Sequence, residues 1–120
     1  MKLENKKLFA AEVLGVGKGR ITIEQLVRLT SENAARIWGL YPKKGALSPG
    51  ADADIIIVDP RKEWILSADN LKSCSDYSIY EGRAVRGKAV KTFIRGRLVA
   101  EDGELVADAP LGEYVYPVSP

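Results

Sequence analysis

The sequence predicts an α+β fold, in which short N-terminal helices precede a small, mostly antiparallel β domain. Residues that cap or end helices are concentrated before residue 45. From residue 54 onward, short apolar or alternating runs are separated by two-residue turn signals such as Asp102-Gly103. The chain has 120 residues, which is enough for one domain with a modest core.

Helical segments are predicted in the first third of the chain. Residues 7–14, KLFAAEVL, have the apolar spacing of a short helix, and the glycines of residues 15–20 interrupt it. Thr22 is the expected N-cap of the next helix, because Gln25 stands three residues later and completes a capping box. The sequence therefore indicates a break followed by a well-defined helix start.

The end of the helical region carries its own signals. We expect Thr30 or Ser31 to recap the chain, so that a further short helix begins there. Gly39 is typical of the left-handed residue that follows a helix, and Pro42 prevents continuation. The residues predicted to form the buried face of this last helix are Ala34, Ala35, Ile37 and Trp38.

The strongest strand signal is the aliphatic run of residues 55–58, within a strand predicted over residues 54–59. Four consecutive branched side chains without alternation indicate a strand that is covered on both faces. Residues 63–66 predict a second short strand, and residues 67–71, SADNL, predict a capped helical turn. The β domain is therefore expected to begin near residue 54.

Later strands are predicted by alternation and by turn residues. Residues 88–94 alternate as a half-buried strand does, and Arg95-Gly96 is the expected turn into residues 97–100. Asp102-Gly103 favours a type I′ turn, which requires positive φ at both central positions. The proline- and aromatic-rich tail, residues 109–120, is expected to lie on the surface.

Composition excludes several classes of function. With 18 basic and 16 acidic residues, the charge gives no reason to expect a nucleic-acid or membrane partner. No apolar run approaches the length of about 20 residues that a membrane span needs. The only cysteine, Cys74, cannot form an intrachain disulfide, and a cytoplasmic location is expected.

The absence of histidine has the clearest chemical consequence. A chain with no histidine contains no Ser-His-Asp or Cys-His nucleophile system and no His-ligated zinc site. One cysteine cannot replace those ligands. We therefore predict no catalytic, cofactor-binding or metal-binding residue in this chain.

Three groups of residues are candidates for a site nonetheless. The first is residues 15–20, GVGKGR, whose glycines, Lys18 and Arg20 precede a helix and could hold a phosphate. A phosphate-binding loop follows a strand, however, whereas the residues before this loop look helical. The spacing matches neither the Walker pattern nor the dinucleotide fingerprint, so an ordinary loop between helices is favoured.

The second candidate is the set of aspartates around the aliphatic strand, Asp52, Asp54 and Asp59. Acid catalysis or metal binding needs carboxylates that converge on one point. Asp52 and Asp54 are two apart, so both could lie on one face of an extended segment. The alternative is turn chemistry, in which their side chains accept hydrogen bonds from backbone N–H groups and define where the strand starts. Turn chemistry is favoured, because no histidine or second acidic motif joins them.

The third candidate is aromatic. No basic stripe separates these side chains, so packing in a core or interface is favoured over stacking on nucleic-acid bases. The residues are Trp38, Trp64, Tyr77, Tyr80, Tyr114 and Tyr116.

The order of these segments resembles the C-terminal end of cyclic amidohydrolases. The resemblance is carried by KGRITIEQLVRLTSENAARIWGLYPKKGALSPGADADIIIVDP at residues 18–60 and by DYSIYEGRAVRGKAVKTFIRGRLVAEDGELV at residues 76–106. It extends over about residues 8–116 and is greatest to the hydantoinase/dihydropyrimidinase group, with allantoinases and dihydroorotases as near relatives.

The resemblance implies a particular architecture. A full enzyme of this family is several times longer and has a (β/α)8 barrel with two metal ions, usually zinc, held by histidines, a carboxylated lysine and an aspartate. It hydrolyses the amide bond of a cyclic diamide. A second β domain, a β-sandwich, is built from the first and last parts of its chain.

This sequence resembles only part of such an enzyme. Residues 1–44 resemble the last barrel helices, and residues 45–120 resemble the C-terminal part of the β domain with its tail, so the chain is not a complete barrel. No position matches the metal ligands, and the family's metal-binding aspartate lies in a segment upstream of Asp52, Asp54 and Asp59.

Two roles remain open at this stage. In one, the chain is a structural or oligomerisation portion of a zinc-dependent cyclic amidohydrolase and is inactive alone. In the other, it is a stand-alone assembly or binding module derived from that family. The expected partners are further copies of the chain and the missing barrel portion of a parent enzyme.

Overall fold

The computed structural model describes residues 15–70, 76–108 and 110–117. The helix predicted over residues 7–14, the last residue of the predicted turn at 67–71, and Cys74 lie outside these ranges. Residues 67–70 form the predicted turn, in which Ser67 and Asn70 each accept a hydrogen bond from the other's backbone N–H.

Residues 23–37 form one continuous helical stretch with three parts, which are α2 (Ile23–Val27), the π-helical segment η2 (Arg28–Glu32) and α3 (Asn33–Ile37). The predicted capping box is confirmed: the Thr22 N–H donates to Gln25 Oε1 at 2.8 Å, and the Gln25 N–H donates to Thr22 Oγ1 at 3.2 Å. The predicted helix end is also confirmed, since Gly39 has φ 66°.

The predicted recapping at Thr30 or Ser31 is wrong. The backbone stays helical through these residues, and the Thr30 hydroxyl donates to the Leu26 carbonyl oxygen at 2.8 Å instead of capping a new helix. A threonine in a helix can make this internal bond to the preceding turn, so its presence does not by itself mark a helix start.

The predicted buried face of the last helix is also largely wrong. Ala35 is buried, but Ile37 is 81% exposed and Trp38 is 73% exposed. A π-helical turn holds more residues than an α-helical turn, so η2 rotates the following residues away from the face that an uninterrupted α-helix would give them.

A single antiparallel sheet follows, with the strand order β1-β2-β3-β4. This confirms the α+β class and the mostly antiparallel β region. The strands are β1 (Ile55–Ile65), β2 (Ala84–Ile94), β3 (Arg97–Glu101) and β4 (Glu104–Leu105).

β1 differs from the prediction in two respects. The strands predicted at residues 54–59 and 63–66 are one strand, whose pairing with β2 shifts register between Asp59 and Glu63. Pro60 lies in this shift, where its missing N–H costs no ladder bond. The aliphatic run is not covered on both faces: Ile56 is 47% exposed and Ile57 is 45% exposed, and consecutive strand residues point to opposite faces.

Both predicted hairpin turns are present. Arg95 and Gly96 connect β2 to β3 with φ values of 47° and 77°. Asp102 and Gly103 connect β3 to β4 with φ values of 50° and 96°. Positive φ at both central residues is what a type I′ turn requires.

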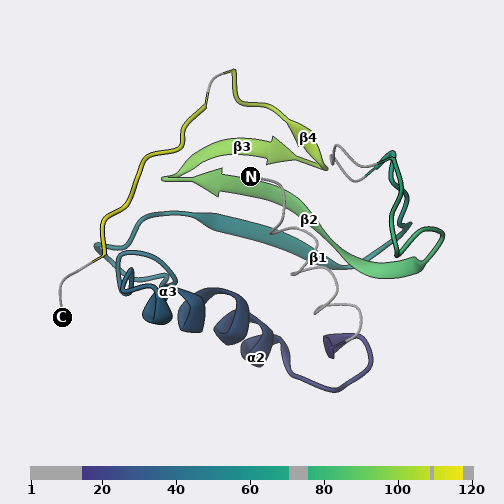
Figure 1. The fold of residues 1–120 in the computed structure, drawn as a ribbon, viewed down its shortest axis with the longest axis horizontal. Coiled ribbons are helices and arrows are strands. Elements are labelled where there is room, and N and C mark those ends of the chain that lie inside the picture. Colours follow the sequence, from purple (N-terminus) through teal and green to yellow (C-terminus); the bar gives the residue numbers. More distant parts are fainter. Residues whose placement is uncertain (1–14, 71–75, 109, 118–120) are drawn as a thin grey trace.

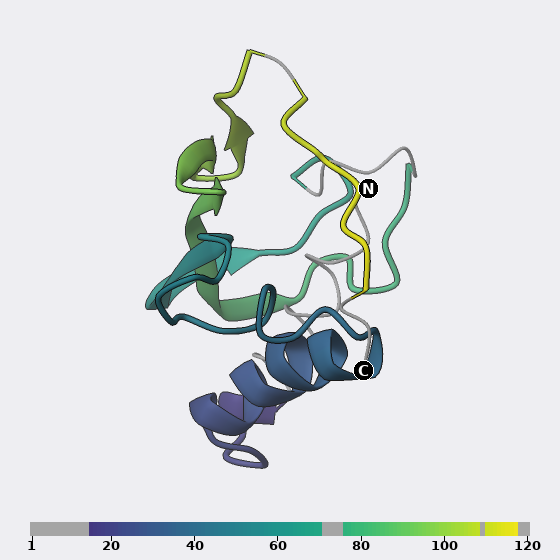
Figure 2. The ribbon, with the colours of Figure 1, turned by 90° about the vertical axis from the view of Figure 1, so that its left-hand side faces the viewer.

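The helical stretch lies on the β1 side of the sheet and β4 lies on the opposite side, as Figures 1 and 2 show. The linker between helix and sheet packs closely on the helix, because a Cβ added at Gly45 would lie 2.6 Å from Ala35 Cβ. The C-terminal segment, residues 110–117, returns from the β4 side to the end of the molecule where α3 ends (Figure 1).

Candidate functional site

The main concentration of polar contacts lies where the linker meets the sheet. We call Lys44, Asp52, Asp54 and Arg95 the junction cluster. Lys44 Nζ lies 2.8 Å from Asp52 Oδ2 and also binds Asp54 Oδ2. The Lys44 side chain is only 19% exposed. The two aspartates thus share one cation, which agrees with the expectation that their spacing can place both on one face.

Asp54 also connects β1 to the β2–β3 turn. Its second oxygen, Oδ1, accepts a hydrogen bond from the Arg95 N–H at 2.9 Å, and the Gly96 N–H donates to the Ala53 carbonyl at 2.9 Å. Asp54 therefore holds the turn in place with one carboxylate oxygen and Lys44 with the other.

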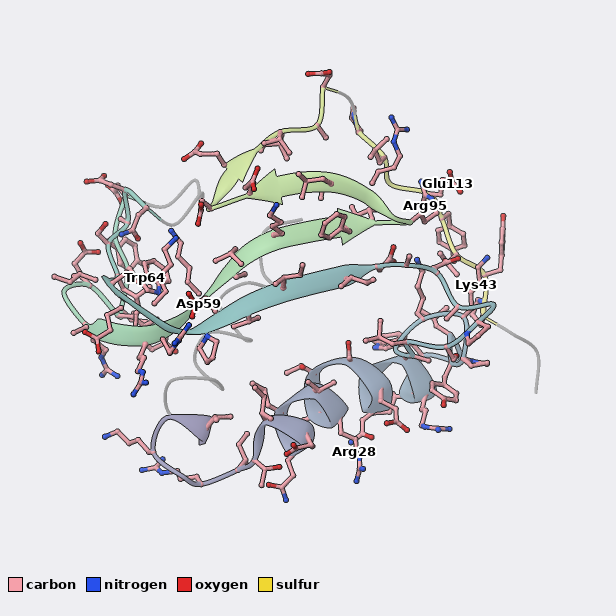
Figure 3. The ribbon with its side chains drawn as sticks, turned by 180° about the vertical axis from the view of Figure 1, so that it is seen from behind. Arg28, Lys43, Asp59, Trp64, Arg95 and Glu113 are labelled. Atoms are coloured by element: carbon pink, nitrogen blue, oxygen red, sulfur yellow. The ribbon has the colours of Figure 1, made fainter. Side chains whose placement is uncertain are left out.

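Arg95 extends the junction cluster to the C-terminal segment. Its guanidinium donates to the Leu111 carbonyl and lies 2.9 Å from Glu113 Oε1. Figure 3 shows Arg95, Glu113 and Lys43 at the same end of the molecule. The cluster thus joins the linker, the start of β1, the β2–β3 turn and the tail.

The electrostatics of the cluster favour fully charged groups. The hydrogen bond from Lys44 holds the pKa of Asp52 below its ordinary value, against a smaller effect of burial. Partial burial acts to lower the pKa of Lys44, but hydrogen bonds to Asp52 and Asp54 outweigh it and leave that pKa raised. Proton transfer in catalysis needs a group that titrates near the working pH, and both shifts move away from neutrality. The geometry therefore favours a structural role, in which the junction cluster holds the segments that meet there.

Asp59 lies apart from this cluster. It is at the other end of the aliphatic run, and Figure 3 shows it away from Lys43 and Arg95. Its Oδ1 accepts a hydrogen bond from the Arg61 N–H at 2.9 Å, which is the local turn chemistry that the sequence suggested. The three aspartates do not converge on one point.

The glycine-rich loop at residues 15–20 forms a local turn. The Gly19 N–H donates to the Val16 carbonyl at 2.9 Å, and the Arg20 N–H donates to the Gly15 carbonyl at 2.8 Å. At the following helix start, the Thr22 and Gln25 N–H groups are occupied by the capping box. The capping box thus occupies two of the backbone donors at this helix start, which favours the ordinary loop.

The aromatic residues do not form one surface. Trp64 is half-buried, donates from Nε1 to the Gly87 carbonyl at 3.0 Å, and has Lys88 Nζ 5.4 Å from its ring centre. Tyr114 and Tyr116 pack edge to face with ring centres 4.8 Å apart in the tail, and both remain exposed. Trp64 and the tail lie at opposite ends of the molecule in Figure 3.

Sequence reasoning missed the cations that organise these carboxylates. Lys44 is ten residues from Asp54, and Arg95 is 41 residues from it. A second unpredicted cluster lies on the sheet, where Lys62 pairs with Asp102 and Lys88 Nζ donates to the Asp102 carbonyl at 3.2 Å. No sequence pattern links such distant positions, so only the folded chain reveals them.

Neither a metal centre nor a membrane span is found in the part of the chain that the structure describes. In residues 15–70, 76–108 and 110–117, no three His, Cys, Asp or Glu side chains are grouped to hold a metal ion. The helices in those same ranges are too short or too polar to cross a bilayer.

Comparison with known proteins defines the class to which this fold and sequence belong. The amidohydrolase family model matches residues 2–99, so the chain belongs to the amidohydrolase family. The resemblance found in the sequence is thereby confirmed.

The relatives identify the branch more closely. The chain is 43% identical over 101 residues to a D-hydantoinase of Geobacillus stearothermophilus, a match that covers 84% of this chain and 21% of the relative. It is 40% identical to an L-hydantoinase of Paenarthrobacter aurescens, covering 84% of this chain and 22% of that one. The chain thus spans about a fifth of the length of the curated relatives it matches.

Solved structures give the same result. A D-hydantoinase from Bacillus sp. AR9 superposes with a TM-score of 0.85 and 37% identity, covering 90% of this chain and 24% of that chain. A dihydropyrimidinase from Brevibacillus agri superposes with a TM-score of 0.79 and 32% identity, covering 82% and 22%. The fold described here is therefore shared with one part of these enzymes.

Proposed function

We propose that this chain is the C-terminal structural portion of a cyclic amidohydrolase of the hydantoinase/dihydropyrimidinase type. The observation that carries the proposal is the combination of high structural similarity with low coverage. The chain superposes on hydantoinases with TM-scores of 0.79 and 0.85 but covers only 22% and 24% of them. Its part in ring opening is to support a barrel that carries the metal and the substrate.

The residues of this chain do not fit the zinc site that the family implies. The sequence has no histidine and one cysteine. In the described residues, the aspartates considered as ligands are engaged elsewhere: Asp52 and Asp54 with Lys44, and Asp59 with the Arg61 N–H. No catalytic step is assigned to them, and we propose that the chain is inactive alone.

A chimera tests this proposal. In the Geobacillus stearothermophilus D-hydantoinase, the segment that this chain matches is replaced by the 120-residue sequence, and hydantoin ring opening is measured for the chimera, the parent enzyme and the isolated chain. The expected result is turnover by the chimera and the parent, and none by the isolated chain. A chimera that folds but has no activity would contradict the proposal, as would stoichiometric zinc with turnover in the isolated chain.

We also propose that the isolated chain self-associates through three exposed aromatic side chains, those of Trp38, Tyr114 and Tyr116. Trp38, Tyr114 and Tyr116 are 73%, 79% and 77% exposed, and exposed aromatic groups of this kind are typical of interfaces. A further contact is proposed for Phe93, which is half-buried in β2. Light scattering over a dilution series should show a dimer or larger species, and a compact monomer at high micromolar concentration would contradict self-association.

A further inference from the structure

Arg95 has a backbone conformation that its residue type disfavours. It is the first central residue of the turn between β2 and β3, and its φ of 47° lies in the left-handed region. Asp102 stands at the same position of the turn between β3 and β4, with φ 50°. Aspartate, asparagine and glycine are preferred in such turns because they tolerate positive φ, whereas a long side chain brings no local advantage there. The strain at Arg95 is therefore expected to be offset by a contact elsewhere in the molecule.

The guanidinium group of Arg95 makes that contact. It donates to the Leu111 carbonyl and lies 2.9 Å from Glu113 Oε1, so one side chain holds two points of the C-terminal segment. The Arg95 side chain is 31% exposed and that of Glu113 is 72% exposed. The backbone N–H of Arg95 separately donates to Asp54 Oδ1 at 2.9 Å. The turn and the C-terminal segment are therefore held by different atoms of the same residue.

The C-terminal segment has little regular structure of its own. Residues 110–117 form neither helix nor strand, and six of these eight residues are exposed, whereas Leu111 and Val115 are half-buried. Figures 1 and 2 show the segment running outside the sheet, from the β4 side to the end of α3. Segments with few buried contacts open at a lower free energy than a paired sheet does. The contacts of Arg95 are therefore expected to decide how firmly this segment is held.

We propose that residues 110–117 are a strap that Arg95 fastens to the β2–β3 turn, and that the strap opens and closes while the sheet stays folded. The fastening consists of one ion pair and one charge-assisted hydrogen bond, and the ion pair is open to water on the Glu113 side. Salt screens such contacts, so ionic strength sets the fraction of chains in which the strap is open. The closed strap fixes the position of Tyr114 and Tyr116, whose ring centres are 4.8 Å apart.

Proteolysis of the 120-residue chain in dilute solution measures the open fraction. Chymotrypsin cleaves after tyrosine, and the bond that follows Tyr114 lies within the strap. The cleavage rate follows the population of the open form when opening and closing are fast. Each rate is divided by the rate for a synthetic peptide of residues 110–117 with the same sequence under the same conditions. This ratio removes the direct effects of the local sequence and of salt on the protease.

Arg95→Asn is the decisive variant. It removes the guanidinium but keeps the backbone N–H that donates to Asp54, and it places a residue that tolerates positive φ in the turn. Cleavage after Tyr114 should become about tenfold faster, because a hydrogen bond to a charged group typically corresponds to at least one power of ten in an equilibrium. Arg97→Gln is the matched control, since it removes an exposed positive charge two residues away in β3 and should leave cleavage unchanged.

Glu113→Gln and salt test the two contacts separately. Glu113→Gln removes the ion pair but keeps the hydrogen bond to the Leu111 carbonyl, so cleavage should rise by less than in Arg95→Asn. In 1 M NaCl, cleavage of the unsubstituted chain should rise severalfold, whereas Arg95→Asn has no ion pair to screen and should not respond. No acceleration by Arg95→Asn, or equal acceleration by Arg95→Asn and Arg97→Gln, would overturn the fastening by Arg95.

Urea below the unfolding transition tests whether the strap opens by itself. The dependence of an opening reaction on urea scales with the surface that it exposes. Cleavage after Tyr114 should therefore depend on urea much more weakly than global unfolding does, because opening the strap exposes only a small part of the chain. A urea dependence equal to that of global unfolding would show that cleavage requires the sheet to unfold, and would overturn the strap.

Discussion

The inner strands of the sheet, β2 and β3, and the helical stretch differ in how completely the described residues cover their apolar side chains. In the sheet, β2 and β3 have neighbours on both sides, and Val85 and Val99 are buried. The helical stretch has equally good local signals, including its capping box, but it leaves four large aliphatic side chains exposed. Local signals can therefore start and end an element correctly without determining how its apolar side chains are packed.

The junction between these two regions gives the largest expected effect. Gly45→Ala should destabilise the chain by about 3 kcal/mol, because a Cβ there requires overpacking and a strained positive φ. The added Cβ would lie 2.6 Å from Ala35 Cβ and 2.9 Å from the Ser31 carbonyl oxygen, and Gly45 has φ 77°. Chemical denaturation measures the loss.

Gly50→Ala is the matched control for this substitution. Gly50 has φ 92° but no atom within 4 Å of an added Cβ, so only backbone strain remains. Its expected cost is about 1 kcal/mol. Equal losses for the two variants would show that the linker does not pack against the helix in the way described.

A glycine substitution in the sheet should reduce stability in the same way, but by less. Gly103 has φ 96° in the turn between β3 and β4. Gly103→Val should cost about 1–2 kcal/mol, because a β-branched residue is poorly tolerated at positive φ. Gly112→Val, at a position with no close neighbours and without positive φ, should be nearly neutral. A neutral Gly103→Val would contradict the type I′ turn.

The two carboxylate clusters predict a smaller, pH-dependent effect. The pKa of Asp52 is lowered by the hydrogen bond from Lys44, and the pKa of Asp102 is lowered by the hydrogen bond from Lys62. A group whose folded pKa is depressed stabilises the protein above its unfolded pKa and loses that stabilisation as the pH falls through the folded value. The free energy of unfolding should therefore decrease as the pH is lowered below 3.8, the ordinary value for these groups.

The dependence of stability on salt concentration should distinguish the junction cluster from the Lys62–Asp102 pair. Lys44 is 19% exposed, whereas Lys62 is 39% exposed and Asp102 is 61% exposed. Exposed pairs are screened more strongly by salt. In 1 M NaCl, the effect of Asp102→Asn on the acid-dependent free energy of unfolding should therefore be reduced more than the effect of Asp52→Asn. Denaturation curves between pH 2 and 6 at low and high salt check this order, and the reverse order would contradict the burial of Lys44.

The sequence predicted the features that depend on neighbouring residues. Thr22 with Gln25, Gly39 and Asp102-Gly103 all have the predicted conformations, because each is determined within a few residues. The assignment of Asp59 to turn chemistry agrees with its bond to the Arg61 N–H for the same reason.

The wrong or missing predictions concern which face of the helix is buried and which distant segments come into contact. The π-helical segment η2 changed which residues face the core, and nothing in the sequence of residues 28–32 distinguishes it from an α-helix. The partners of Asp54, Lys44 and the Arg95 N–H, come from separate segments and could not be paired without the fold. The expected burial of Ile56 and Ile57 is wrong, because the burial of an aliphatic run depends on neighbouring elements that the sequence of the run does not specify.

Amide hydrogen exchange, compared between the isolated chain and the D-hydantoinase chimera, tests the central claim most directly. The claim is that the inner strands β2 and β3 are covered within the described chain, whereas the helical stretch is completed by the rest of a hydantoinase fold. Amides of β2 and β3 should be protected in both proteins, whereas amides of residues 23–37 should exchange rapidly in the isolated chain and become protected in the chimera. Equal, high protection of the helical stretch in both proteins would contradict the claim.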